Sequence, residues 1–178
     1  MLVMTACERP HRRQAGLTLL ELITVVAILA LLMGVAVPSM HEMLDRNRLK
    51  AAAQAVAEDL QWARSEAIKR NRPIALSLHP STWCYGVTLA SDLGCDCRGD
   101  QDAPNGCELK RVSGTDYPGI RLSATFDRTT FEPRRATARN GSLSLQSSRG
   151  AAIKVILSRL GRVRLCSPND TLPGYGDC

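Results

Sequence analysis

The chain is poor in the residues with which enzymes usually work. Its 178 residues include three histidines, two tryptophans, three tyrosines and two phenylalanines. His11, His41 and His79 are far apart in the sequence, and none stands beside a nucleophile motif. A glycine-rich phosphate loop and paired metal-ligand motifs are also missing. These absences argue against an enzyme and against a bound cofactor. The scarcity of aromatic rings leaves little for stacking on the bases of single-stranded nucleic acid.

Acidic residues are missing from a long C-terminal stretch. No aspartate or glutamate occurs between Pro133 and Asn169, although the whole chain carries 17. The same stretch contains eight cations, namely Arg134, Arg135, Arg139, Arg149, Lys154, Arg159, Arg162 and Arg164. So many charges of one sign cannot all be neutralised locally, and such a surface attracts anionic partners. The net charge of +6 is modest, so the uneven distribution is the stronger indication.

An uninterrupted apolar run extends from Leu17 to Val37 and contains a single charge, Glu21. As a helix rising about 1.5 Å per residue, this run would span about 31 Å, the thickness of the hydrocarbon core of a bilayer. Three arginines precede it, and positive charge there keeps the N-terminus in the cytoplasm. The run is longer than the apolar part of a secretory signal, and no small-x-small cleavage site follows it. It therefore predicts a single transmembrane helix in the inner membrane, with the rest of the chain on the periplasmic side.

The segment Gly16-Leu17-Thr18-Leu19-Leu20-Glu21 resembles the class III signal of type IV pilins and type II secretion pseudopilins. In that family a prepilin peptidase cuts after the glycine, here Gly16, and the new first residue, here Leu17, is methylated. The usual first residue is phenylalanine, so Leu17 departs mildly from the pattern. The glutamate, here Glu21, pairs with the N-terminal ammonium of a neighbouring subunit during assembly. The resemblance implies that the partners are prepilin peptidase and other pilins, and that the assembled protein lies in a pilus at the cell surface.

Beyond Pro38 the helical pattern continues. Six apolar residues step by three or four positions and form one stripe: Leu49, Ala52, Val56, Leu60, Ala63 and Ala67. The charged residues of this segment fall on other faces and are expected to form a solvated surface, compatible with contacts to neighbouring helices in a filament. Asn71-Arg72-Pro73 ends the helix, because proline disfavours helix in the residue before it.

Strand patterns follow the helix at residues 74–79, 83–90, 109–112, 120–126, 143–146, 152–158 and 162–166. Asn140-Gly141 predicts a tight turn before the fifth of these. The predicted organisation is a leader at 1–16 that is removed, a transmembrane helix at 17–37, its amphipathic continuation at 38–72 and a β-rich head at 73–178. The predicted fold class is α+β, with the long N-terminal helix packed on an antiparallel β head, as in type IV pilins.

Cysteines are placed so that cleavage would leave an even set of six. Cys7 lies in the leader, and six cysteines in an exported domain predict disulfides because the periplasm is oxidising. Cys166 and Cys178 are expected to pair and to close a C-terminal loop. The remaining four allow three pairings, which stay open: Cys84, Cys95, Cys97 and Cys107. A zinc site made by these four is the alternative, although its Cys-x-Cys spacing is narrower than the usual one.

Strict alternation marks the segment Gly161-Arg162-Val163-Arg164-Leu165. On a strand, Val163 and Leu165 would face the core, while Arg162 and Arg164 would stand about 6.6 Å apart on the open face. Guanidinium groups bind phosphate oxygens in bidentate fashion, so two of them at this spacing can straddle neighbouring backbone phosphates. Such binding would be non-specific and salt-sensitive. The alternative is a solvated edge that only blocks strand-to-strand aggregation.

The order of a strand, a turn, Gly-Arg-x-Arg and a cysteine loop resembles the ending of the FimT/GspH branch of minor pilins and pseudopilins. In the FimT group this motif binds DNA for uptake in natural transformation, and the matching residues are Gly161, Arg162 and Arg164. Because few aromatic rings are present to stack on single strands, double-stranded DNA held by its backbone fits better as the partner. On charge and proximity, three further cations join the predicted site: Arg159, Lys154 and Arg149. A structural minor pilin or a GspH-like type II secretion pseudopilin, without nucleic-acid binding, stays open as the alternative.

Overall fold

The computed structural model describes residues 16, 18–89, 94–100, 103–135, 137–170 and 172–178. Of the predicted leader only Gly16 is described, and Leu17 also lies outside the described residues. Besides three short 3-10 helices, the described residues form one α-helix and eight strands: α1 (Leu19–Arg70), β1 (Ile74–His79), β2 (Cys84–Leu89), β3 (Lys110–Ser113), β4 (Ile120–Ala124), β5 (Arg128–Phe131), β6 (Gly141–Ser147), β7 (Ala152–Leu157) and β8 (Val163–Cys166).

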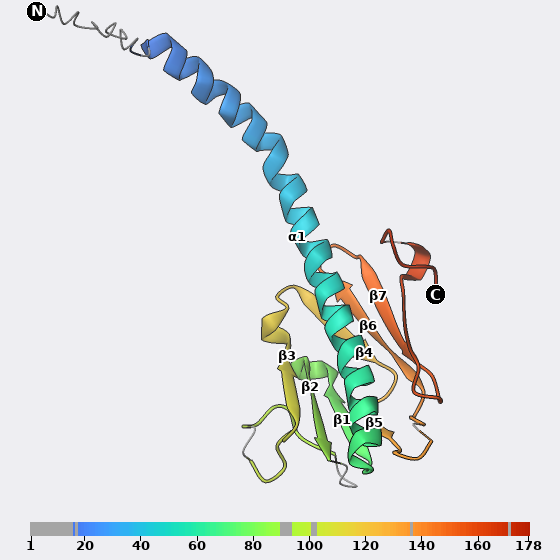
Figure 1. The fold of residues 1–178 in the computed structure, drawn as a ribbon. Coiled ribbons are helices and arrows are strands. Elements are labelled where there is room, and N and C mark those ends of the chain that lie inside the picture. The colour runs from blue at the N-terminus through green and yellow to red at the C-terminus, as the bar shows by residue number, and fades with distance from the viewer. Residues whose placement is uncertain (1–15, 17, 90–93, 101–102, 136, 171) are drawn as a thin grey trace, which may run out of the picture. The chain divides into compact units, whose positions relative to one another are not determined.

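The strands form two four-stranded antiparallel sheets (Figure 1). The first has the order β3-β2-β1-β5, and the second has the order β4-β6-β7-β8. β1 and β2 form a hairpin, with Ile74 opposite Leu89 and His79 opposite Cys84. In the second sheet β6, β7 and β8 follow one another as antiparallel neighbours. The arginine-bearing strand β8 is therefore an edge strand of the second sheet.

The chain divides into two compact units, residues 1–40 and 41–178. In the first unit α1 exposes large apolar side chains throughout, among them Leu19, Leu31 and Met33. This helix is long and apolar enough to cross a membrane, and its most apolar window is not buried inside the protein. Length and composition thus agree with the membrane helix expected from the sequence.

The second unit, residues 41–178, holds the entire hydrophobic core and is called the globular head below. Each residue of the predicted apolar stripe on α1 is at most 1% exposed. The stripe packs against inward-facing side chains of both sheets, such as Leu76, Leu143 and Val155. A long N-terminal helix packed on antiparallel sheets confirms the predicted α+β fold class. Because every core residue that the structure describes lies in the head, we expect this unit to fold without residues 1–40.

The end of α1 agrees with the sequence pattern. Asn71 adopts a left-handed conformation with φ of 48°. Its N–H donates to the carbonyl of Ile68, and the N–H of Arg72 donates to the carbonyl of Ala67, both at 3.2 Å. These two bonds form a Schellman motif with asparagine in the place that glycine usually takes. Pro73 follows and cannot continue the helix.

Two acidic residues of α1 contradict the expected solvated surface. Asp59 is 4% exposed and Glu66 is 7% exposed. The hydroxyl of Tyr85 donates to Asp59 Oδ2 at 2.8 Å, and Lys110 of β3 forms an ion pair with the same carboxylate. Glu66 is held by Arg70, with 2.6 Å between Nε and Oε1. Asp59 can be buried because strands distant in sequence supply donors in place of water.

Burial raises the pKa of the Tyr85 phenol well above its ordinary value of 10.0, and the Asp59 carboxylate adds to the effect. Tyr85 stays neutral in the folded head, whereas in the unfolded chain it ionises at about pH 10. The contribution of this group to the free energy of unfolding is therefore fully present below pH 10 and is lost as pH rises further. We therefore expect the free energy of unfolding to fall above about pH 10, with Tyr85 contributing up to about 1.4 kcal/mol per pH unit. Urea titrations between about pH 8 and 11 measure this dependence. The Tyr85→Phe variant should show a shallower decline, and an unchanged decline would contradict the prediction.

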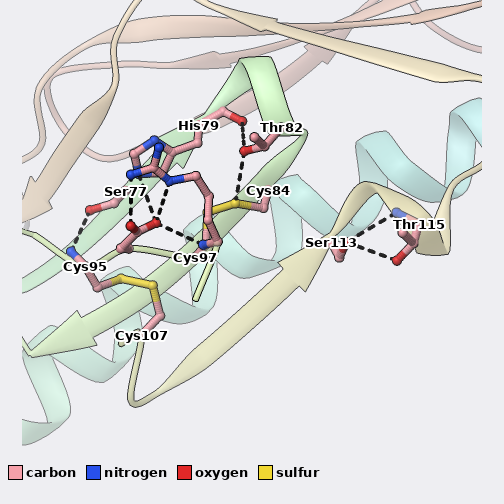
Figure 2. Close-up of a disulfide and its surroundings, with 11 residues drawn as sticks. Ser77, His79, Thr82, Cys84, Cys95, Cys97, Cys107, Ser113 and Thr115 are labelled. Atoms are coloured by element: carbon pink, nitrogen blue, oxygen red, sulfur yellow. Dashed lines mark hydrogen bonds and ion pairs between the residues drawn. A yellow bond between two sulfur atoms is a disulfide. The ribbon is translucent and has the colours of Figure 1, made fainter. Parts of the chain in front are cut away.

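Three disulfides stabilise the head. Cys166 pairs with Cys178, as the sequence predicts, and the open pairings resolve to Cys84–Cys97 and Cys95–Cys107. The disulfides Cys84–Cys97 and Cys95–Cys107 pack together as a small buried cluster beside β2 (Figure 2). Each disulfide closes a loop of 12 or 13 residues, for which the chain-entropy model gives a stabilisation of roughly 3 kcal/mol. Paired cysteines offer no thiolates, so the zinc alternative does not fit this arrangement.

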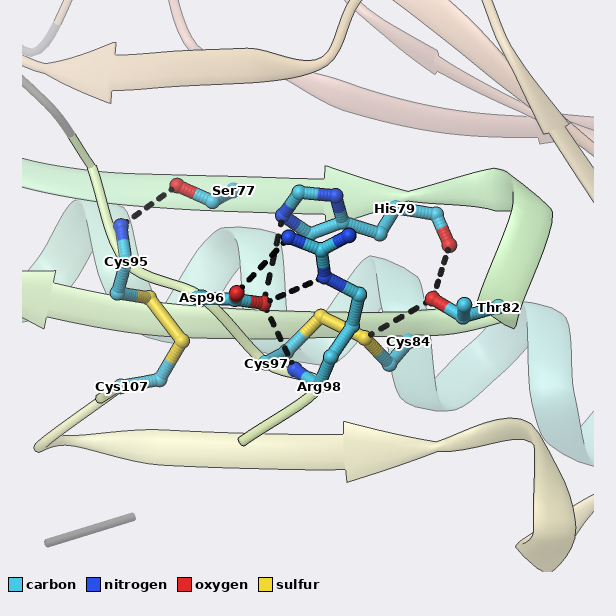
Figure 3. A network of polar contacts seen from close by, with 9 residues as sticks. All are labelled: Ser77, His79, Thr82, Cys84, Cys95, Asp96, Cys97, Arg98 and Cys107. Carbon is cyan, nitrogen blue, oxygen red and sulfur yellow. Dashed lines mark hydrogen bonds and ion pairs between the residues drawn. A yellow bond between two sulfur atoms is a disulfide. The ribbon is translucent and has the colours of Figure 1, made fainter. Parts of the chain in front are cut away.

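A polar network covers this disulfide cluster (Figure 3). The Arg98 guanidinium donates two parallel hydrogen bonds of 2.9 Å to the Asp96 carboxylate, from Nε to Oδ1 and from Nη2 to Oδ2. The backbone N–H of Arg98 also donates to Asp96 Oδ1, and His79 Nε2 lies 4.0 Å from that oxygen. The Arg98 bonds hold the pKa of the Asp96 carboxyl well below its usual range. The loop between the cysteines thus carries its own counter-charges.

The sequence analysis was wrong at two places in the sheets. β5 was not predicted, yet it pairs with β1 through Ile74 opposite Phe131. No tight hairpin turn forms at Asn140-Gly141, because Gly141 begins β6 and neither residue has a positive φ. Glycine is instead required at position 141 by packing, because a Cβ there would lie 2.3 Å from Cδ1 of Phe126.

Candidate nucleic-acid interface

The turn between β7 and β8 sets the position of the predicted motif. The N–H of Gly161 donates to the carbonyl of Ser158, and the N–H of Ser158 donates to the carbonyl of Arg162, both at 2.9 Å. The three-residue loop between them ends at Gly161, which has φ of 67°. This is the hairpin loop that ends in a left-handed residue, which glycine adopts without a steric penalty. Gly161 of the motif therefore shapes the turn from which Arg162 enters the edge strand.

Register places the predicted cations on one face of the second sheet. Arg164 lies opposite Ile156, and Lys154 lies opposite Cys166. Arg162 immediately precedes β8, and its N–H donates to the side-chain oxygen of Ser158 at 3.0 Å. Side chains alternate along a strand, so Arg162, Arg164 and Lys154 all project to the face opposite the core.

Burial agrees with this alternation. The side chains of Arg162 and Arg164 are exposed, whereas Val163 and Leu165 are half-buried and pack against the core. Arg159 is exposed in the turn itself. A shallow groove on this part of the surface is lined by Ile156, Ser158 and residues 162–164. The structure thus places Arg159, Arg162 and Arg164 at the turn end of the sheet edge, whereas Lys154 lies on the same face further along β7, opposite Cys166.

The four strands that make this face carry charge of one sign only. The sequences of β4, β6, β7 and β8 contain no aspartate or glutamate. Within the described part of the chain, no side-chain ion pair or hydrogen bond engages Arg159, Lys154, Arg162 or Arg164. Unpaired guanidinium groups on strands without acidic residues favour binding of an anion that presents several charges. We call Arg159, Lys154, Arg162 and Arg164 the β8 basic face.

Arg149 does not belong to this face, which corrects the sequence prediction. It lies in the turn between β6 and β7, at the end of β7 opposite the Gly161 turn. Its Nε is 2.9 Å from Oδ2 of Asp45 on α1. Proximity in sequence was misleading here, because the six residues of β7 separate the two turns by about 20 Å.

One cation on the open face of the second sheet was missed by the sequence reasoning. Arg121 of β4, at the other edge of this sheet from β8, is exposed and lies opposite Gln146 of β6. Its position on the open face follows from the alternation Ile120-Arg121-Leu122, in which both apolar neighbours are buried. Arg121 lies before the acid-free stretch, so the count of charges along the sequence did not include it.

At the other end of the chain, the predicted processing and assembly residues lie where α1 begins. Gly16 is exposed and precedes the helix. The side chain of Thr18 accepts a hydrogen bond of 3.3 Å from the N–H of Glu21, which satisfies one of the free N–H groups of the first turn. Glu21 is exposed in that turn. Its pairing with a neighbouring subunit stays a prediction.

Comparison of the sequence with protein families finds two matches. The family described as type II transport protein GspH matches residues 52–161, and the prokaryotic N-terminal methylation motif matches residues 11–37. Together they cover the membrane helix and most of the head. The GspH match stops at Gly161, immediately before the two arginines of the motif.

Similarities to individual known proteins agree with these family matches. The pilin-like protein PilA1 of Thermus thermophilus is 33% identical over 158 residues, which cover 84% of this chain and 97% of that protein. The type IV minor pilin FimU of Pseudomonas aeruginosa has the same fold, with a TM-score of 0.54 and 19% identity over 73% of this chain and 99% of FimU. The minor pseudopilin EpsH from the type 2 secretion system of Vibrio cholerae gives a TM-score of 0.53 and 15% identity, over 69% of this chain and 99% of EpsH. The chain therefore belongs to the GspH family of pilin-like proteins.

Proposed function

We propose that this protein is a minor type IV pilin of the FimT kind, which binds double-stranded DNA non-specifically for uptake in natural transformation. Gly161, Arg162 and Arg164 would form the centre of the site, and Arg159 and Lys154 would extend it. The observation that carries the proposal is the pair of exposed arginines, two residues apart on an acid-free sheet edge and without a side-chain partner among the described residues.

The chemistry of the β8 basic face suits the backbone of a duplex. Each guanidinium can present two N–H groups to one phosphate, and side chains two residues apart on a strand are separated by about 6.6 Å. Arg164 is held within the ladder to β7, and Arg162 is held through its N–H bond to Ser158. The two guanidinium groups thus start from a fixed backbone, which lowers the entropy lost on binding.

The family sets the context for this role. Pilin-like proteins are structural subunits and are not in general enzymes. The methylation motif and the relationship to a pilin-like protein imply processing by a prepilin peptidase and assembly with other pilins. In our proposal the peptidase cuts between Gly16 and Leu17, and Glu21 pairs with the N-terminal ammonium of a neighbouring subunit. Before assembly the helix would anchor the protein in the inner membrane with its head in the periplasm, and after assembly the head would lie in a surface pilus.

Binding of duplex DNA by the purified globular head tests the proposal. We expect a gel shift with duplexes of unrelated sequence, and affinity that falls steeply with salt. At least two phosphate contacts would give a slope of log K against log salt of about −1.8 or steeper. Duplexes rich in A·T and in G·C should bind equally, because backbone contacts carry no sequence information. A head that fails to shift any duplex at low salt would overturn the proposal.

A second candidate function is favoured by the likeness to EpsH and by the GspH match itself. In that case the protein is a structural minor pilin or a secretion pseudopilin, and its basic face docks another subunit. Deletion of the gene distinguishes the two roles. Loss of transformation with intact pili supports the DNA-binding role, whereas loss of pili or of secretion supports the structural one.

A further inference from the structure

A second groove lies on the helix side of the turn between β7 and β8. Its walls are Gln61, Arg64, Ser65 and Ile68 of α1 on one side and residues 161–163 on the other. Arg162 lines both this groove and the one on the open face of the sheet. The two grooves therefore meet at Arg162.

Arg64 contributes an unused donor to this second groove. The Nε of Arg64 is buried, and no hydrogen-bond partner for it exists among the described residues. A buried donor without a partner costs free energy, more so when the group is charged. Arg64 as a whole is half-buried and lines the groove, so an acceptor that enters the groove can bond to its guanidinium group.

No acceptor of opposite charge comes from the neighbouring residues of α1. Glu66, the acidic residue nearest to Arg64 in sequence, is engaged by Arg70 with 2.6 Å between Nε and Oε1 and by Lys69 at 3.8 Å. The hydroxyl of Ser65 donates to the carbonyl of Trp62 at 2.8 Å. Arg64 and Arg162 are left as the charged groups of the groove.

We propose that this groove is an anion site in which Arg64 and Arg162 hold a phosphate of the DNA backbone, so that the duplex interface continues from β8 onto α1. This inference rests on the proposed function. The groove has Arg64 on one wall and Arg162 on the other, and a phosphate suits this arrangement because its oxygens can accept from both arginines at once. Arg162 then joins the contacts on the two sides of the turn.

The variant Arg64→Gln in the globular head tests the inference. It removes one cation and keeps part of the side-chain stem, so we expect the affinity for duplex DNA to fall about five- to tenfold at moderate salt. The slope of log K against log salt should become shallower by about 0.9, the value for one phosphate contact. Arg64→Lys keeps the charge and loses Nε, so it should keep the slope and lose part of the affinity. Arg111→Gln, an equal change at an exposed residue of β3 in the other sheet, should leave both quantities unchanged.

The outcomes separate this inference from the proposed function. If changing Arg162 and Arg164 abolishes binding while Arg64→Gln leaves affinity and slope as in the wild type, the groove is not part of the interface. If the wild-type head does not bind duplex DNA, both ideas fail. Titration with inorganic phosphate, followed by NMR at the Nε–H of Arg64, identifies the source of the anion. Saturation by phosphate in a head that binds no DNA would show a free-phosphate site and overturn the assignment to nucleic acid.

Discussion

A globular head with both Arg162→Gln and Arg164→Gln is expected to lose about a hundredfold in affinity for duplex DNA. The reason is that each charge-assisted hydrogen bond to a phosphate contributes about 1.5 kcal/mol or more, and two such contacts disappear together. The slope of log K against log salt should also decrease in magnitude by about 1.8. Fluorescence anisotropy with a labelled duplex at several salt concentrations measures both quantities.

Two comparisons make this result decisive. Both arginines are exposed, so the variant should unfold at the same urea concentration as the wild type, to within about 0.5 kcal/mol. The double variant Arg46→Gln with Arg111→Gln removes the same charge from exposed positions outside the second sheet. An equal loss of affinity in that control would mean that net charge alone governs binding, and the site at β8 would be refuted.

Replacing Asp59 with alanine is expected to destabilise the head by about 3 kcal/mol, roughly a 150-fold change in the unfolding equilibrium. The carboxylate is the acceptor for the buried Tyr85 hydroxyl and the partner of Lys110. Without it the phenol keeps a buried donor with no partner, and a small cavity opens between α1 and the first sheet. Lys110 is 44% exposed, so water can solvate its ammonium group and limits the total. Urea-induced unfolding of the head measures the loss.

Glu58, the residue before Asp59 on α1, provides the matched control. It is exposed, so Glu58→Ala should change the free energy of unfolding by less than about 0.5 kcal/mol. Asp59→Asn keeps an oxygen that can accept from Tyr85 and loses the ion pair, so its cost should fall between those of the two alanine variants. Equal stabilities of Glu58→Ala and Asp59→Ala would show that burial of this carboxylate contributes nothing to the fold.

Most of the fold could be predicted from local sequence patterns. The stripe from Leu49 to Ala67, the stop at Asn71 and the alternation in β4, β7 and β8 all depend on neighbours within a few residues, and the structure agrees with them. β5 escaped prediction because its four residues become a strand by pairing with β1, more than fifty positions earlier in the chain. Burial of Asp59 escaped for the same reason, since its partners come from β2 and β3.

The candidate site likewise has residues that local sequence predicts and residues whose position depends on tertiary packing. The turn at Gly161 and the exposure of Arg162 and Arg164 follow from five consecutive residues. Arg149 was misassigned, because its partner Asp45 is about a hundred positions away and belongs to α1. Arg64 was expected on the solvated surface of the helix, and the burial of its Nε depends on tertiary packing that no periodicity reveals.

The disulfide between Cys166 and Cys178 has a practical consequence for any binding measurement. Cys166 is the last residue of β8, so the bridge ties Cys178 to the strand that carries Arg164. A purification tag fused after Cys178 would emerge beside that strand, where polyhistidine could contact phosphates itself and an acidic epitope could occupy the arginines. Affinity handles therefore belong at the start of the head, ahead of His41.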